Sequence, residues 1–156
     1  MPRLAMLIFF FVFGAEGASA EYRITEDRGG QIGEYLRLFQ EIRAGGTVVV
    51  IDGMCLSACT LALGILPRSQ LCATEQAKLG FHAAWRFDEQ NKPVPSPEGT
   101  RALLQIYPPA VRRWIAGRGG LGPRMKYLVG KPLRTIVRSC TPKDMGQVTD
   151  HRAQAR

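Results

Sequence analysis

Two residues that could react as a pair, Ser57 and His82, lie twenty-five positions apart in one largely apolar part of the chain. Ser57 stands where an apolar segment of small residues begins, shortly after the valine- and isoleucine-rich run 48–51. His82 ends a second apolar segment, 78–82. A serine hydroxyl becomes an effective nucleophile when a base removes its proton, and histidine is the most common such base. The pair therefore predicts nucleophilic catalysis of the serine-hydrolase type.

The local surroundings of both residues also allow structural roles. Backbone N–H groups at a helix start can bind the oxyanion that forms when a carbonyl is attacked. Ser57 does not lie in the Gly-x-Ser-x-Gly elbow of the α/β-hydrolases. A serine at a helix start is also a common N-cap, and a histidine at the end of an apolar strand is often structural. Both alternatives remain open at this point.

The elements around the pair predict an alternating α/β order. A helix is expected over 31–44, where apolar residues recur at spacings of three and four, and Gly45-Gly46 ends it. The run 48–51 is β-branched without alternation, as in a parallel strand covered on both faces. A tight turn at Asp52-Gly53 is expected to follow it. The remaining elements expected up to His82 are strands at 22–24, 71–73 and 78–82 and a buried helix over 57–66.

The second half of the chain has weaker patterns. Residues 86–99 are polar and contain three prolines, which indicates an exposed loop over the site. Helices are expected over 100–107 and from Pro109 onward, with a glycine-rich break at 117–122. A basic amphipathic segment over 123–128, a helix or strand over 133–140 and a helix start at Thr141 follow. The whole predicts one α/β domain, with a parallel sheet and flanking helices, over 21–150 and a polar tail over 151–156.

The first twenty residues predict a secretory signal peptide. They combine an early arginine, a ten-residue apolar run at 4–13 and a final Ala-Ser-Ala, with cleavage expected after Ala20. An uncleaved anchor is the alternative, although ten apolar residues are half of a bilayer span. The expected location is therefore the periplasm or the exterior, with no stable membrane span after cleavage.

Four cysteines, Cys55, Cys59, Cys72 and Cys140, suggest disulfides in an exported chain. Four cysteines allow three pairings, and the sequence does not choose among them. A zinc site is disfavoured because no Cys-x-x-Cys pair is present, and neither a metal nor another cofactor is predicted. The net charge is +8, but the basic residues are dispersed without interleaved aromatic residues, so nucleic-acid binding is not inferred.

The order of these features carries a family resemblance. Gly29-Gly30, a helix, a hydrophobic strand, Gly53-x-x-x-Ser57-Ala58 and a strand ending in Phe81-His82 resemble the Clp protease proteolytic subunit and the wider crotonase-like superfamily. The resemblance covers about 22–84 and is greatest to small exported members with a Cys-x-Ser-x-Cys segment. It implies that Ser57 is the nucleophile and His82 the base. It also implies that the backbone N–H groups of Gly30 and Ala58 form an oxyanion hole.

Two departures from the family pattern stand out. The family's third catalytic residue is an aspartate before the last helix, and no acid stands at 136–139; Asp144 and Asp88 are the nearest candidates by position. The sheet before Gly29 is also shorter than in the family, so Clp-like rings are not expected, although a homo-oligomer remains open. Disulfides from Cys55 and Cys59 to Cys72 and Cys140 are one interpretation of the cysteines, and a cysteine nucleophile at 55 or 59 is the alternative.

The expected function is that of an exported Clp protease-like serine hydrolase, in particular a peptidase that acts on a peptide or protein substrate. The missing acid favours an alternative, in which a catalytically inactive crotonase-like protein has a binding or structural role in the periplasm. Acyl-CoA chemistry, which other crotonase-like enzymes perform, is disfavoured for an exported chain.

Overall fold

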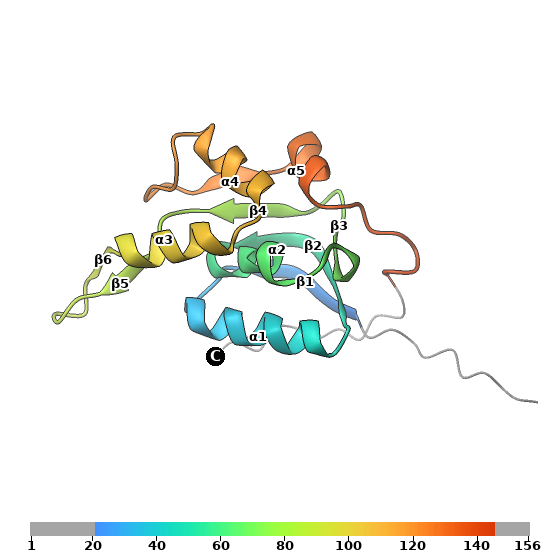
Figure 1. Cartoon of the computed structure of the whole chain (residues 1–156), viewed down its shortest axis with the longest axis horizontal. Helices are drawn as coiled ribbons and strands as arrows, with labels where there is room; N and C mark the ends of the chain where they lie inside the picture. Colours follow the sequence, from blue (N-terminus) through green and yellow to red (C-terminus); the bar gives the residue numbers. More distant parts are fainter. Residues whose placement is uncertain (1–20, 146–156) are drawn as a thin grey trace, which may run out of the picture.

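The computed structural model describes residues 21–145 of the 156-residue chain. The predicted signal peptide, the polar tail and the last part of the predicted domain lie outside these residues. The described part is a mixed α/β domain with one mainly parallel sheet and five α-helices (Figure 1). None of its helices is both long enough and apolar enough to cross a membrane.

The central sheet has five strands, and four of them run parallel. β1 (Glu21–Asp27) pairs with β2 (Val48–Leu56), and α1 (Ile32–Ala44) connects them. β3 (Leu71–Ala73) and β4 (Lys78–Phe81) both pair with β2, the first along its beginning and the second along its end. β7 (Lys126–Leu128) runs antiparallel to β4. The predicted strand–helix–strand order of the first half is confirmed.

The tight turn expected at Asp52-Gly53 is wrong, because β2 continues through both residues to Leu56. Between Ile24/Ile51 and Glu26/Met54 the register with β1 shifts by one residue, so β2 contains a bulge at this point. A Cβ atom at Gly53 would lie 1.9 Å from the carbonyl oxygen of Thr25. Glycine is therefore present at 53 because the backbones of β1 and β2 approach closely, and not because the chain turns there.

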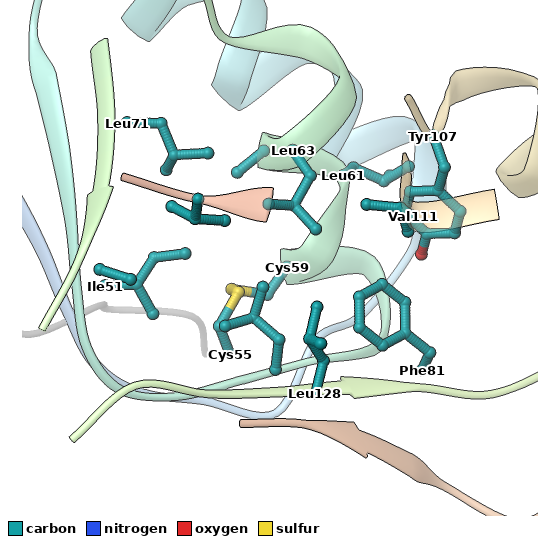
Figure 2. Packing of buried hydrophobic residues seen from close by; sticks show 14 of the residues in the cluster. Ile51, Cys55, Cys59, Leu61, Leu63, Leu71, Phe81, Tyr107, Val111 and Leu128 are labelled. Carbon is teal, nitrogen blue, oxygen red and sulfur yellow. A yellow bond between two sulfur atoms is a disulfide. The ribbon is translucent and has the colours of Figure 1, made fainter. Parts of the chain in front are cut away.

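A single hydrophobic core lies between the sheet and its helices. The 3₁₀ helix η1 (Ser57–Leu61) and α2 (Ala62–Ile65) form the buried helix predicted after Ser57, and Leu66-Pro67 ends it. In the view of Figure 1, α1 lies below the central strands, whereas α4 (Pro109–Ala116) and α5 (Gly130–Ile136) lie above them. Figure 2 shows buried side chains from these layers packed together, including Leu61, Phe81 and Val111.

The region expected as an irregular loop, 86–99, is mostly a β-hairpin. β5 (Trp85–Phe87) pairs with β6 (Pro93–Pro95), and α3 (Pro97–Ile106) begins directly afterwards, earlier than expected. Pro93 and Pro95 face Phe87 and Trp85 across the hairpin. Neither proline belongs to the central pair, Arg86 and Val94, so neither removes a hydrogen-bond donor from it. Figure 1 shows the hairpin and α3 projecting together from one end of the domain.

The segment after α5 does not begin the expected helix within the described residues. Residues 142–145 form a turn, in which the Asp144 N–H donates to the Thr141 carbonyl at 2.9 Å. Further back, Ser139 forms a parallel bridge with Ala73, which extends the edge of the sheet beyond β3.

Two disulfides join the four cysteines, as Cys55–Cys59 and Cys72–Cys140. The interpretation that Cys55 and Cys59 bond to Cys72 and Cys140 is therefore wrong. The sharp change from β2 to η1 brings the Cα atoms of Cys55 and Cys59 to 5.3 Å, within disulfide range. The second bridge closes a loop of about seventy residues and ties β3 to the segment after α5. Disulfides of this kind persist in oxidising compartments.

Candidate active site

Ser57 occupies a constrained position at the end of β2. Leu56 is still extended, and the backbone then turns through Ser57 with a φ of 55°, in the left-handed region that residues other than glycine rarely adopt. Asn91, in the hairpin turn, is the other non-glycine residue between 21 and 145 with a positive φ. This conformation directs the Ser57 side chain out of the strand and into a cavity. Strained backbone of this type is concentrated at functional sites.

His82 lies within hydrogen-bond distance of this serine, with its Nε2 atom 2.8 Å from Ser57 Oγ. The topology of the sheet explains why these two side chains lie together. β2 and β4 are parallel neighbours with Leu56 opposite Gly80, so the residues that follow the two strands emerge at the same edge of the sheet. A Cβ atom at Gly80 would lie 2.6 Å from Leu56 Cδ2 and 2.8 Å from Met125 Sδ, so the side chains of Leu56 and Met125 pack closely over this glycine. A neutral imidazole that accepts the hydroxyl proton is the form that a general base requires.

The Gly29-Gly30 segment packs directly against the serine. Gly29 has a φ of 79°, and a Cβ atom on it would lie 2.6 Å from Ser57 Cβ and 2.9 Å from the Ala58 nitrogen. The Asp27 carboxylate holds this segment, because its Oδ1 accepts hydrogen bonds from the Gly29 N–H at 2.7 Å and from the Tyr35 hydroxyl. Burial and this hydrogen bond raise the pKa of Tyr35, which keeps its hydroxyl protonated as a donor.

Gly30 and Ala58, the residues predicted to form an oxyanion hole, line the same cavity as Ser57 and His82. Ala58 is the second residue of η1, and N–H groups in the first turn of a helix have no acceptor within it. The Gly30 N–H donates no hydrogen bond to any residue between 21 and 145. The two residues predicted for the oxyanion hole thus lie beside Ser57 at the cavity.

A buried network supports the serine from behind. Thr60 Oγ1 donates to the Ser57 carbonyl at 2.6 Å, so the Tyr107 hydroxyl, 2.6 Å from Thr60 Oγ1, acts as the donor to threonine. Burial raises the pKa of Tyr107 to about 12, and this keeps that donor protonated. The Tyr107 ring also packs edge-on against Phe81, the residue before His82, at 5.4 Å between centroids. The network therefore links the backbone segments of both members of the pair.

The cavity in front of Ser57 has a volume of about 480 Å³ and one mainly apolar wall. The hairpin supplies this wall through Trp85 and Phe87, which are 52% and 55% exposed and pack edge-on at 5.0 Å. Trp85 therefore lines the cavity rather than packing in the core. The residues that line the cavity are Gly30, Gln31, Ile32, Ser57, Ala58, His82, Ala84, Trp85, Arg86, Phe87 and Leu103.

Neither aspartate considered for a third catalytic residue is bonded to His82. Asp144 accepts two hydrogen bonds of 2.7 Å from Arg138 and two more from Thr141. Asp88 accepts from the backbone N–H groups of Gln90 and Lys92 in the hairpin turn. No carboxylate between residues 21 and 145 forms a hydrogen bond with His82, and the pair has no orienting acid in the described part of the chain.

The Asp144 contacts predict a specific pH dependence of stability. Hydrogen bonds from Arg138 hold the pKa of Asp144 well below its ordinary value of 3.8. This carboxylate therefore stabilises the fold fully above pH 3.8, and the contribution is lost as the pH falls from there toward the lowered pKa. Denaturant titrations between pH 6 and pH 2 measure the unfolding free energy. As the pH is lowered, this free energy should fall less steeply in Asp144→Asn than in the unmodified protein. Parallel curves for the two proteins would contradict this role.

Several residues of the site were not identified from the sequence. A threonine three residues after Ser57 fits side-chain bonding back to a helical carbonyl, a local signal that could have indicated Thr60. Asp27 stands two residues before Gly29, which is the spacing of an Asx-type turn. Tyr107 and Phe87 had no such signal, because only the packing of α3 and the hairpin brings them to the site.

Within residues 21–145, no group of three or more histidine, cysteine, aspartate or glutamate side chains is arranged to bind a metal ion. Comparison with protein-family models gives no match to this chain, and comparison with curated proteins gives none either.

Proposed function

We propose that this protein is an exported serine hydrolase of the Clp protease/crotonase-like type that acts as a peptidase on peptide or protein substrates. Ser57 is the nucleophile in this proposal, and His82 is the general base. One observation carries it: a serine with left-handed backbone at the end of a parallel strand has its Oγ 2.8 Å from the Nε2 of a histidine that follows the next strand. The two disulfides support an exported location.

The proposed reaction follows from these positions. Ser57 Oγ attacks the substrate carbonyl carbon while His82 Nε2 takes the hydroxyl proton. The backbone N–H groups of Gly30 and Ala58 stabilise the resulting oxyanion. The intermediate collapses to an acyl-serine as His82 returns the proton to the leaving amine, and water, activated by the same imidazole, then hydrolyses the ester.

Within residues 21–145 no carboxylate is bonded to His82, and this affects both the expected turnover rate and the choice between a hydrolase and a binding protein. An unsupported imidazole is less well oriented, and loss of the orienting acid costs about 10⁴-fold in turnover in serine proteases. We therefore expect slow turnover relative to enzymes with a complete triad. The same observation favours the alternative function, a binding protein that uses the cavity without catalysis.

The test is covalent labelling with a fluorophosphonate, which phosphonylates serines that are activated as nucleophiles. The oxidised protein should incorporate one equivalent, and peptide mass spectrometry should locate it on Ser57. Ser96, whose Oγ accepts from the Gly99 N–H as an ordinary helix N-cap, is a built-in control and should remain unlabelled. Absence of labelling in correctly oxidised protein would argue against the hydrolase and for the binding role.

A further inference from the structure

Ser57 is the central residue of a five-residue ring that the Cys55–Cys59 disulfide closes. We infer that this disulfide positions Ser57, and that the site is complete only in a chain that has undergone oxidative folding. The catalytic meaning of this inference rests on the proposed function, but the geometric claim concerns the Ser57–His82 contact itself. Figure 2 shows the sulfur–sulfur bond inside the core, and both cysteines are fully buried.

The ring is anchored at both ends. Cys55 pairs with Asp27 of β1 on one side and with Leu79 of β4 on the other, so the sheet fixes its position. Cys59 lies in η1, which packs on α1 and β4. The bridge therefore restricts how the chain can pass from the end of the sheet to the first helical turn. Within this short ring, Ser57 has its left-handed φ at the point where β2 ends and η1 begins.

Without the bridge, fewer constraints oppose relaxation of this backbone. A serine in the left-handed region is at a higher energy than in the extended or helical regions, and such conformations persist only where their surroundings enforce them. Apart from the bridge, Ser57 has the hydrogen bond of its Oγ with His82, the hydrogen bond from Thr60 to its carbonyl and the packing of Gly29 against its side chain. Rotation of Ser57 toward an ordinary φ would move Oγ away from His82 Nε2.

Formation of the bridge is a two-electron oxidation. The Cys55 and Cys59 thiols lose two protons and two electrons, and a disulfide oxidant accepts them and becomes two thiols. Because both sulfur atoms are buried in the folded protein, this exchange takes place while the chain is folding, and the core afterwards shields the bond. A chain folded under reducing conditions would keep its sheet but lack the constraint on Ser57.

The second disulfide provides a matched control. Cys72–Cys140 joins β3 to the segment after α5, and neither cysteine lines the cavity in front of Ser57. We expect Cys55→Ala/Cys59→Ala to lower the fluorophosphonate labelling rate by at least about tenfold, the size expected when a strained conformation is released. Cys72→Ala/Cys140→Ala should melt at a lower temperature but be labelled at the unmodified rate. Equal labelling rates in both folded double variants would overturn the inference.

A redox comparison keeps the test informative if the first double variant does not fold. One portion of the Cys72→Ala/Cys140→Ala protein, in which only the Cys55–Cys59 pair can change, is refolded in excess dithiothreitol and labelled. A second portion is unfolded and refolded with oxidised glutathione before it is labelled. The sulfur atoms then fill the same volume in both states. Labelling that is slow in the reduced portion and fast in the oxidised portion supports the inference, whereas the same rate in both states overturns it.

A readout independent of activity separates this inference from the proposed function. Nitrogen NMR of the His82 imidazole should respond to Ser57→Ala in the oxidised protein, where the two side chains are bonded, and should respond much less in the reduced protein. An equal response in both states overturns the positioning role. Failure of the oxidised protein to label, with the NMR contrast intact, refutes the hydrolase while retaining the disulfide's effect on the geometry.

Discussion

Replacing His82 with alanine is expected to lower the rate of fluorophosphonate labelling at Ser57 by about 10³-fold, because general-base catalysis contributes about 10²- to 10⁴-fold. The imidazole Nε2 is 2.8 Å from Ser57 Oγ, and no other titratable side chain between residues 21 and 145 is bonded to that hydroxyl. Labelling rates are followed by intact-protein mass spectrometry at several probe concentrations, with Ser57→Ala as the zero reference.

A comparison with a second variant makes this result specific to the Ser57–His82 contact. Asp144→Asn should label at the unmodified rate, because the Asp144 carboxylate is bonded to Arg138 and Thr141 rather than to the histidine. A His82→Ala protein that is folded and labels as fast as the unmodified protein would show that Ser57 is not activated by this imidazole.

Gly53→Ala is expected to destabilise the fold by at least about 3 kcal/mol, the upper part of the range for overpacking a core. The added Cβ atom would lie 1.9 Å from the carbonyl oxygen of Thr25, a backbone atom that can move only if β1 shifts relative to β2. For a domain of this size, the melting temperature should fall on the order of 10 °C. Chemical denaturation, with circular dichroism as the probe, measures the change.

The matched control is Gly33→Ala, in the first turn of α1. A Cβ atom at Gly33 would have no neighbour within 4 Å, and glycine in a helix is less favourable than alanine by about 0.5–1 kcal/mol. This variant should therefore be slightly more stable than the unmodified protein. If both glycine variants had the same stability, the close contact between the two strands at the bulge could not be the reason for glycine at 53.

The Ser57–His82 pair could be predicted from the sequence because it depends on a simple topological rule. Each residue follows an apolar strand, and two parallel strands of one sheet end at the same edge. The run 48–51 and the periodic apolar residues of 31–44 likewise predicted a buried strand and its covering helix, since local pattern and burial agree there. Gly29 belongs to the glycine pair that precedes the first helix in the sequence pattern, and it packs against Ser57 in the structure.

Tertiary structure decided the features that depend on contacts between distant segments. Gly53 appeared to be a turn glycine, and only the approach of Thr25 from β1 identifies it as part of a bulge. The Cys55–Cys59 pairing and the left-handed φ of Ser57 arise together from the junction of β2 and η1, which no residue pattern specifies. Tyr107 reaches the Ser57 turn because the end of α3, at Ile106, packs closely against Gly64 of α2. By itself, the sequence determined which two side chains would meet; long-range packing determined their conformation, support and surrounding cavity.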